Sequence, residues 1–240
     1  MSTRETAKHA PVALITGASQ GLGRALAVEL ARRGWRLVIE ARRADRLAAS
    51  AAELAAWTEV TAIAGDVTDA AHRRALVRGA AALGGEVLMV NNASTLGASP
   101  LPALATVDPD IVRRTFEVNV VAPFAFLRDL RSAGVDVRTI VNITSDAGVE
   151  AYEGWGVYGA SKAALEHASR VLATEQPGIR VLVVDPGDMR TEMHQDAFPG
   201  EDISDRPLPE ESARAIVALV ERGSPSGRYV ARELGTVGAQ

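Results

Sequence analysis

Short apolar runs alternate with longer segments of helical periodicity along the whole chain. The runs are rich in β-branched residues and have the length of buried strands, whereas the longer segments repeat apolar residues at helical spacing. This alternation is typical of a parallel sheet covered by helices on both faces. The pattern predicts strands at residues 12–16, 36–40, 60–64, 86–90, 137–145, 179–184 and 228–230. It predicts helices at residues 21–33, 44–57, 69–83, 110–131 and 210–222, and one that carries Tyr158 and ends near residue 175.

These elements predict a single doubly wound, Rossmann-like α/β domain with a seven-stranded parallel sheet. Residues 1–10 form the predicted N-terminal tail. Residues 11–240 form the domain, which includes a long connection at about residues 186–209. No linker, repeat or low-complexity tract divides the chain, and 240 residues suffice for one sizeable core.

Composition narrows the class of protein further. A net charge of −4 provides no basic field for nucleic acid, and no apolar stretch is long enough for a signal peptide or a membrane span. The absence of cysteine excludes disulfides, thiol catalysis and thiolate metal sites. The four histidines show no metal-ligand spacing, so we predict no metal. We expect a cytoplasmic protein that binds neither nucleic acid nor membranes.

A lysine stands four residues after Tyr158, in a chain that uses arginine almost everywhere else. Its only lysines are Lys8 and Lys162, among 26 basic residues. On a helix Tyr158 and Lys162 share one face, and a nearby ammonium lowers the pKa of a phenol from about 10 towards neutrality. We therefore interpret Tyr158 as an acid and base for a carbonyl or an alcohol. The alternative is an ordinary helix pair without chemistry.

Two further features place polar groups at the carboxyl ends of predicted strands. Ser145 ends an apolar strand, where open α/β sheets bind ligands, and its hydroxyl can donate to a substrate oxygen that Tyr158 protonates. A serine that only satisfies a loop amide is the alternative. Gly17, Gly21 and Gly23 lie between the first strand and its helix. Glycines in that context let the backbone approach a pyrophosphate at the helix N-terminus.

Together these motifs resemble those of the short-chain dehydrogenases/reductases, from about residue 12 to residue 230. Asn91-Asn92-Ala93 matches that family's motif after the fourth strand, although Ser94 stands where the family usually has glycine. The resemblance implies a catalytic set of Asn119, Ser145, Tyr158 and Lys162. It implies cofactor contacts at Gly17, Ser19, Gln20, Gly21, Leu22, Gly23, Asp66, Val67, Asn92, Ala93, Ser94, Tyr158, Lys162, Pro186, Gly187, Met189 and Thr191.

The family's chemistry is hydride transfer between a nicotinamide and a carbonyl/alcohol pair. By resemblance, Lys162 holds the nicotinamide ribose and Asn119 positions a water that links Lys162 to solvent. We accordingly expect an oxidoreductase that acts on a small-molecule carbonyl or alcohol. The resemblance also implies a homodimer or homotetramer, packed through the helices that contain Asn119 and Tyr158. The alternatives are an NADP(H)-binding regulator without turnover and an NAD-dependent alcohol dehydrogenase.

The second predicted strand ends in Glu40-Ala41-Arg42-Arg43, where dinucleotide folds choose their cofactor. By resemblance, Ala41 occupies the place at which NAD-preferring members carry aspartate, and Arg42 matches a phosphate-binding position. An arginine fork suits a 2′-phosphate, and strand alternation directs Glu40 to the opposite face. We therefore favour NADP(H), with contacts from Ala41, Arg42 and Arg43. A Glu40 that turns inward to bind the ribose would favour NAD(H) instead.

The connection at residues 186–209 is long enough to act as a lid or binding loop. It carries adaptable methionines, which suit an apolar pocket. The residues expected at the mouth of this pocket are Leu96, Tyr152, Trp155, Met193 and His194. We infer a moderately apolar carbonyl substrate.

Overall fold

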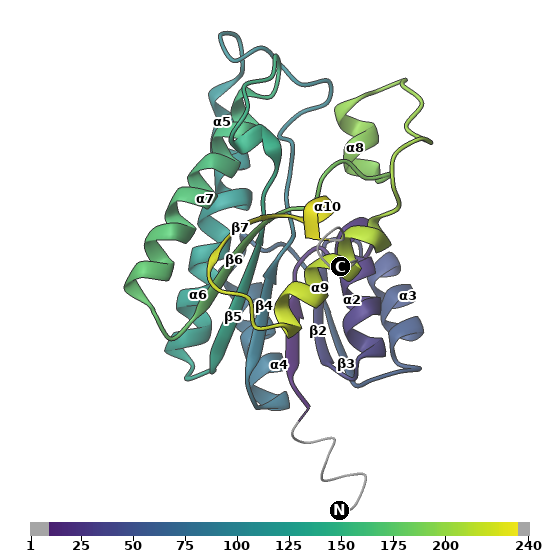
Figure 1. Cartoon of the computed structure of the whole chain (residues 1–240), viewed down its shortest axis with the longest axis vertical. Helices are drawn as coiled ribbons and strands as arrows, with labels where there is room; N and C mark the ends of the chain where they lie inside the picture. The colour runs from purple at the N-terminus through teal and green to yellow at the C-terminus, as the bar shows by residue number, and fades with distance from the viewer. Residues whose placement is uncertain (1–9, 235–240) are drawn as a thin grey trace, which may run out of the picture.

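The computed structural model describes residues 10–234, which form a single sheet of seven strands with helices on both faces (Figure 1). Every neighbouring pair of strands runs parallel, in the order β3-β2-β1-β4-β5-β6-β7. The predicted doubly wound α/β fold is confirmed. Residues 1–9 of the predicted tail and residues 235–240 lie outside the described residues. The strands are β1 (Val12–Ile15), β2 (Arg36–Ala41), β3 (Val60–Ala64), β4 (Val87–Asn91), β5 (Val137–Ile143), β6 (Arg180–Asp185) and β7 (Gly227–Val230).

Two hydrophobic layers hold the helices to the sheet, because successive strand side chains point to opposite faces. Ile15 and Val90 pack with the helices of one face, whereas Leu14 and Met89 pack with those of the other. Each such fully buried side chain stabilises the fold by about 1.5–3 kcal/mol. The first layer holds α2 (Gly21–Arg32), α3 (Ala44–Leu54) and α9 (Pro209–Glu221). The second holds α4 (Ala70–Leu83), α6 (Ala122–Ser132) and α7 (Gly156–Glu175).

The strand order reverses between β1 and β4, and this reversal fixes where a ligand can bind. From β1 the chain winds outward through β2 to β3, and then returns to place β4 on the other side of β1. The loops after β1 and β4 therefore diverge, one towards each face, and leave a crevice at the carboxyl ends of the strands. The glycine-rich loop follows β1, and the Asn-Asn-Ala motif follows β4.

The structure differs from the predicted elements mainly in one interrupted helix and two short added helices. The helix predicted at residues 110–131 is interrupted: α5 (Pro109–Phe116) passes through a π-helical turn at Glu117–Val121 into α6. Pro123 explains the interruption, since it has no N–H to donate to the carbonyl of Asn119 four residues earlier. The long connection after β6 also contains the short helix α8 (Glu192–Ala197), and a final turn, α10 (Ala231–Leu234), follows β7.

Candidate active site

A large cleft opens at the crevice, with a volume of about 1710 Å³. That volume exceeds the roughly 300–1,000 Å³ of a typical small-molecule pocket, as a site for a dinucleotide together with a substrate requires. Every site residue proposed from the sequence lines this cleft except Asn119. The motifs predicted from separate parts of the chain therefore meet in one place.

The loop after β1 and the motif after β4 are fastened to each other by hydrogen bonds. The hydroxyl of Thr16 accepts from the backbone N–H groups of Asn92 and Ala93, both at 3.0 Å. The Asn92 amide donates to the carbonyls of Thr16 and Gly17, at 2.9 and 3.2 Å. A side chain at Gly23 would place its Cβ 2.2 Å from the Gly17 carbonyl oxygen. Only glycine allows this close approach, which brings the N-terminus of α2 to the cleft.

Glu40 also holds the glycine-rich loop in place, through a hydrogen bond to its backbone. Its carboxylate accepts a hydrogen bond of 3.1 Å from the backbone N–H of Gly17, and Glu40 is only 2% exposed. Burial raises the pKa of Glu40 to about 7, although the bond from Gly17 acts in the opposite direction. Ala41 packs on the other face of the sheet, as strand alternation predicted. Sequence reasoning weighed Glu40 only as a ribose ligand and missed its contact with the loop.

An arginine-rich edge lies where β2 meets α3, next to α8. Arg43 pairs with Glu192 of α8 at 2.8 Å, and Arg46 pairs with the same carboxylate. Both arginines also donate to the side chain of Gln20 in the glycine-rich loop. Arg42 is exposed and lines the cleft. Sequence reasoning found the arginines at positions 42 and 43 but missed Glu192, which lies far along the chain.

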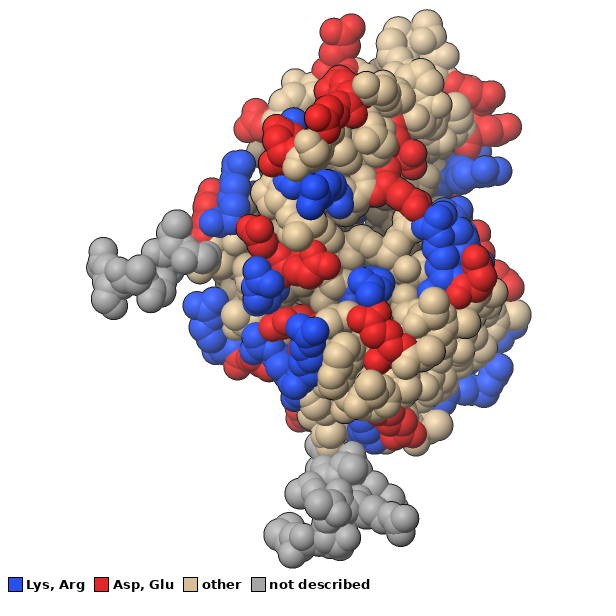
Figure 2. Space-filling model, turned by 90° about the vertical axis from the view of Figure 1, so that its right-hand side faces the viewer, with Lys and Arg blue, Asp and Glu red and all other residues tan. Residues whose placement is uncertain are grey.

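On this side of the molecule, Figure 2 shows Lys and Arg side chains interspersed with Asp and Glu side chains. Asp66 lines the cleft together with Arg42 and Arg43. Burial acts to raise its pKa, but hydrogen bonds from Thr68 and the charge of Arg42 hold it below its ordinary value.

The predicted catalytic side chains meet on the opposite wall of the cleft, which β5 and α7 build. Tyr158 is 7% exposed and Lys162 is 2% exposed. The ammonium of Lys162 lies 5.4 Å from the centroid of the Tyr158 ring and donates to the carbonyl of Ile143 at 2.8 Å. Gly159 permits this arrangement, since a Cβ there would lie 2.3 Å from the carbonyl oxygen of Ala147. Helix α7 therefore lies directly against the loop that carries Ser145.

The electrostatics of this wall correct one prediction. Burial raises the pKa of Tyr158 above its ordinary value, and the charges of Asp185 and Asp146 add to the effect, while the hydroxyls of Ser94 and Ser145 oppose it. Burial also lowers the pKa of Lys162 to about 7, against the charge of Glu166. Lys162 was expected to lower the pKa of Tyr158. That expectation is wrong for the protein alone, because the same burial disfavours both charged forms.

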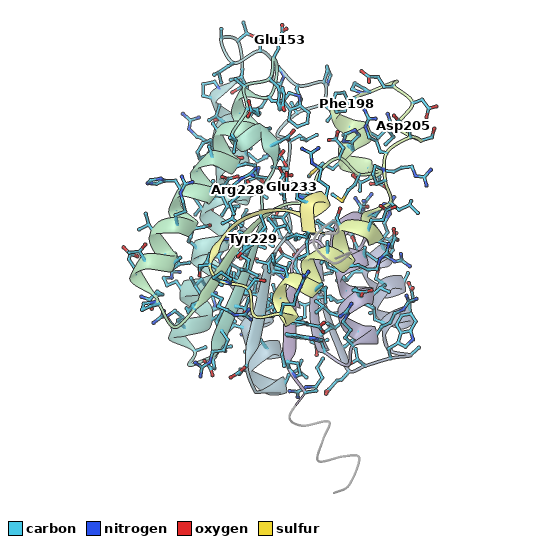
Figure 3. All side chains as sticks on the ribbon, in the orientation of Figure 1. Glu153, Phe198, Asp205, Arg228, Tyr229 and Glu233 are labelled. Carbon is cyan, nitrogen blue, oxygen red and sulfur yellow. The ribbon has the colours of Figure 1, made fainter. Side chains whose placement is uncertain are left out.

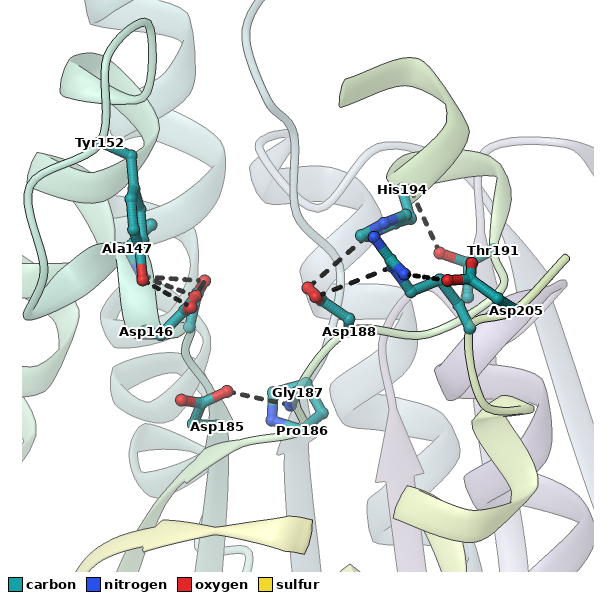
Figure 4. A network of polar contacts seen from close by, with 12 residues as sticks. Asp146, Ala147, Tyr152, Asp185, Pro186, Gly187, Asp188, Thr191, His194 and Asp205 are labelled. Carbon is teal, nitrogen blue, oxygen red and sulfur yellow. Dashed lines mark hydrogen bonds and ion pairs between the residues drawn. The ribbon is translucent and has the colours of Figure 1, made fainter. Parts of the chain in front are cut away.

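The hydroxyl of Ser145 forms a hydrogen bond with an acidic neighbour. Its Oγ donates to Asp146 at 2.9 Å, and the hydroxyl of Tyr152 donates to the same carboxylate at 3.1 Å. The backbone N–H of Ala147 donates to both Ser145 and Asp146. Figure 4 shows Tyr152 and Asp146 on one side of the cleft, with Asp188 on the other. Ser145 does satisfy a loop amide, as the alternative held, and it also lines the cleft beside Tyr158.

Asn119 lies behind the cleft rather than in its lining. It is 1% exposed, and its side chain is fully bonded within the protein. Its Oδ1 accepts from Ser94 at 3.1 Å and from the backbone of Thr95 at 2.9 Å. Its Nδ2 donates to the Thr95 carbonyl and to Ser161, both at 2.9 Å. These four bonds use the whole carboxamide and fasten the loop after β4 to α7, while the role of Asn119 in positioning a water stays a prediction.

An ionic network lies behind Lys162, in which two buried carboxylates, Glu166 and Asp185, meet the exposed Arg228. The carboxylate of Glu166 accepts from the hydroxyl of Thr144 at 2.7 Å and from Arg228 at 3.1 Å, and Arg228 also reaches Asp185 at 3.2 Å. Arg228 comes from β7, as Figure 3 shows. The network therefore ties the last strand of the sheet to the helix that carries Tyr158 and Lys162.

Aromatic side chains form the end of the cleft next to α8. Trp155 packs edge-on against Tyr158 with ring centroids 5.6 Å apart, and lies 5.9 Å from Phe198. Phe198 in turn lies 4.8 Å from His194. Sequence reasoning did not assign Phe198 to the site, and nothing in the local pattern distinguishes it from other loop residues. Leu96 and Met193 complete this apolar end.

His194 links the aromatic end to the acidic connection after β6. Its Nδ1 lies 3.8 Å from Asp188, and Arg206 holds the same carboxylate at 3.9 Å (Figure 4). Burial lowers the pKa of His194, although the charge of Asp188 opposes it.

Residues 10–234 contain no group of three His, Cys, Asp or Glu side chains placed to hold a metal ion. No helix within that range is long and apolar enough to cross a membrane.

Comparison with known proteins identifies relatives of this architecture. The family model described as short chain dehydrogenase matches residues 11–202. A sepiapterin reductase of Meriones unguiculatus is 34% identical over 199 residues, covering 77% of this chain and 76% of that protein. A rhamnolipids biosynthesis 3-oxoacyl-[acyl-carrier-protein] reductase of Pseudomonas aeruginosa is 34% identical over 192 residues, covering 76% and 74%. The structure of an alcohol dehydrogenase from Thermococcus sibiricus, complexed with 5-hydroxy-NADP, is 28% identical with a TM-score of 0.78, covering 92% and 96%.

Proposed function

Since the chain belongs to the short-chain dehydrogenase family, whose model matches most of its length, we propose that it is an NADPH-dependent oxidoreductase that interconverts a carbonyl and an alcohol. The observation that carries this proposal is the convergence of Ser145, Tyr158 and Lys162 on one wall of the cleft that the glycine-rich loop also lines. The two relatives described above are both named as reductases, which supports the direction of the reaction.

Each side chain of this wall has a separate task. The bound cofactor supplies the hydride. Tyr158 donates the proton to the carbonyl oxygen, and the raised pKa of its phenol keeps that proton in place until it is needed. Ser145, whose hydroxyl donates to Asp146 in the protein alone, turns that proton to the same oxygen when a substrate binds. Lys162, with a pKa near 7, supplies positive charge that compensates the phenolate after the transfer.

Three features support NADP(H) over NAD(H). Arg42 and Arg43 line the cleft beside Ala41, where a carboxylate would repel a 2′-phosphate. The carboxylate of Glu40, which a ribose would need, is buried and bonded to Gly17. The Thermococcus sibiricus relative was solved with an NADP analogue.

The aromatic end of the cleft supports a moderately apolar carbonyl compound as substrate. Trp155 packs against Tyr158, Phe198 packs against Trp155, and Leu96 and Met193 extend this apolar surface. A substrate with a planar or branched apolar group next to its carbonyl would bury that group there.

We also propose a homo-oligomer packed through α6 and α7, with the exposed Val121 and Val171 at the contact. Sedimentation of the purified protein tests that assembly.

The test is a panel of carbonyl compounds assayed with NADPH and with NADH for the parental protein and for Tyr158→Phe. We expect Tyr158→Phe to bind NADPH normally and to lose about 10²–10⁴-fold in kcat, since the proton donor is removed. Tyr152→Phe is the matched control, because that phenol lines the same cleft but bonds only to Asp146, and it should keep most of its activity. Parental turnover in Tyr158→Phe would contradict the assignment of the acid. Tight NADPH binding with no turnover across the panel would indicate the regulator instead.

A further inference from the structure

The turn that follows β3 lines the cleft on the side away from Tyr158. It contributes Asp66, Val67 and Thr68, and Arg42 follows β2, the strand that pairs with β3. Strands β2 and β3 lie on one side of the reversal between β1 and β4, whereas β5, at the wall of Tyr158, lies on the other. A dinucleotide that binds at this reversal spans both sides. If its nicotinamide lies beside Tyr158, its adenosine half reaches this turn.

The backbone of the turn is held by Arg73, a buried side chain of α4. Arg73 is 6% exposed and does not itself line the cleft. Its Nη1 donates to the carbonyl of Val67 and to that of Thr68, both at 2.9 Å. Its Nε donates to the carboxylate of Asp129 at 3.1 Å, and Asp129 comes from α6. One guanidinium therefore fixes two consecutive peptide groups of the turn and ties them to a helix from another part of the chain.

The other hydrogen bonds of these residues are local. Oδ1 of Asp66 accepts from the backbone N–H and the hydroxyl of Thr68, at 2.9 and 2.8 Å. The backbone N–H of Asp69 donates to the carbonyl of Asp66 at 3.0 Å. These bonds shape the turn, but they join its residues only to one another. Without Arg73 the turn would lose its bond to α6, and the carbonyls of Val67 and Thr68 would turn towards water.

This set of acceptors suits arginine. A guanidinium is planar and presents its N–H groups in a fixed fork, so Nη1 can serve both carbonyls while Nε serves Asp129. A lysine ammonium is a compact charge on a flexible stem and cannot reproduce that fork. The charges also balance, since the side chains of Arg73 and Asp129 are 7% and 15% exposed and a buried ion needs such a partner. The pair can therefore stay charged beside the turn and keep it in one position.

We propose that Arg73 is a positioning residue for cofactor binding, whose guanidinium, anchored by Asp129, holds the turn of residues 66–68 where the adenosine half of the cofactor contacts it. This rests on the function proposed above. A turn that is free to shift must be brought back into place when the adenosine binds, and this lowers the affinity. Because Arg73 touches neither the cofactor nor the substrate, the chemical step at Tyr158 should not depend on it.

The experiment titrates the whole chain with NADPH and with adenosine 2′,5′-bisphosphate, which carries the adenosine half without the nicotinamide. We expect Arg73→Met to weaken the binding of both about tenfold. Arg73→Lys keeps the charge but loses the fork, so it should weaken both by a smaller factor, about threefold. At saturating NADPH the kcat of each variant should stay within about twofold of the parental value, since only binding is affected.

Arg36→Met is the matched control for a purely structural effect. Arg36 is also 6% exposed and donates to backbone carbonyls, those of Ala10, Leu83 and Gly84. It begins β2, so it lies at the opposite end of the strands from the cleft. Arg36→Met should lower the midpoint of denaturant unfolding, as Arg73→Met does, and leave both affinities unchanged.

If Arg73→Met does not fold, Asp129→Asn provides the test, because it keeps an acceptor for Nε without the charge and should weaken both ligands about twofold. Parental affinity for adenosine 2′,5′-bisphosphate in folded Arg73→Met, or otherwise in Asp129→Asn, would overturn the role of Arg73. An equal loss of affinity in Arg36→Met would also overturn it.

The failure of the proposed function gives a different result. Binding of adenosine 2′,5′-bisphosphate that depends on Arg73, in a protein without carbonyl turnover, would keep the role of Arg73 and contradict the oxidoreductase. ADP is titrated in parallel. Binding of ADP that depends on Arg73, without binding of the bisphosphate, would keep that role and contradict the choice of NADPH.

Discussion

The two walls of the cleft handle charge in opposite ways. On the wall of β5 and α7, Tyr158 and Lys162 are almost fully buried, and burial is the largest influence on the pKa of each. On the edge between α3 and α8, the side chains of Arg43 and Glu192 are 43% and 50% exposed and pair across the surface. Water weakens such exposed pairs, whereas a buried group is affected by every neighbour. Single contacts should therefore decide catalysis at the wall of β5 and α7. At the edge between α3 and α8, the number of charges should decide the affinity for the cofactor.

Removing the charge of Lys162 is expected to give the largest effect. Lys162→Met deletes the ammonium beside the Tyr158 ring, so the phenolate loses its compensating charge, and kcat should fall about 10²-fold or more. Lys162→Arg should rescue little, because the guanidinium fork cannot take the place of a compact ammonium bonded to Ile143. Steady-state kinetics at saturating NADPH measures both variants. Near-parental kcat in Lys162→Met would show that catalysis does not need the ammonium of Lys162 to compensate the phenolate.

The buried carboxyl of Glu40 should appear in the pH dependence of stability. Its pKa rises from 4.5 to about 7 on folding, so the folded protein holds the proton more tightly than the unfolded chain. Its contribution is therefore fully present below pH 4.5 and is lost as the pH rises through 7, by about 3 kcal/mol. Denaturant unfolding across this range should show a shallower decline for Glu40→Gln than for the parent. Parallel curves would exclude a buried, uncharged Glu40.

Glu166 tests whether the charge of Lys162 depends on the network behind it. The carboxylate of Glu166 raises the pKa of Lys162, which burial holds near 7. Glu166→Gln should lower the pKa of Lys162 further, on the order of one unit. Less ammonium then remains at neutral pH, so kcat should fall several-fold there. Below the new pKa the activity should recover towards the parental value. The pH profile of kcat measures this, and a profile that superimposes on the parental one would remove Glu166 from the account.

The exposed edge should give the smallest effect. If a 2′-phosphate binds Arg43, it must displace Glu192 from Arg43 and Arg46. Glu192→Gln should therefore tighten NADPH binding about twofold at low salt, leave NADH binding unchanged and lose its effect at high salt. Glu53→Gln is the matched control, because Glu53 pairs with Arg24 at similar exposure outside the cleft. Weaker NADPH binding in Glu192→Gln would mean that Glu192 arranges the arginines rather than competing for them.

Sequence pattern predicts the buried framework well, because periodicity and glycine spacing are local. The seven strands, the loop of Gly17, Gly21 and Gly23, and the placement of Ser145 beside Tyr158 all follow from it. The interruption of the helix at Pro123 also had a local cause, although it was not predicted.

What pattern cannot supply is burial and contact between distant segments. The spacing of Tyr158 and Lys162 indicated one shared helix face, but the sign of the phenol's pKa shift depends on how much water reaches both groups. Asn119 lies on the expected helix, yet the three residues that bond to its side chain, Ser94, Thr95 and Ser161, come from other segments. The pairing of Arg46 with Glu192 joins residues that are far apart in the chain.

The most direct measurement is the ultraviolet titration of Tyr158 in a protein whose other two tyrosines, Tyr152 and Tyr229, are replaced by phenylalanine. We predict that without cofactor the phenol ionises above its ordinary value of 10.0, and that saturating NADP⁺ lowers this pKa by adding positive charge beside the ring. A phenol that ionises at or below 10.0 in the protein alone would contradict the claim that burial keeps Tyr158 protonated as the donor.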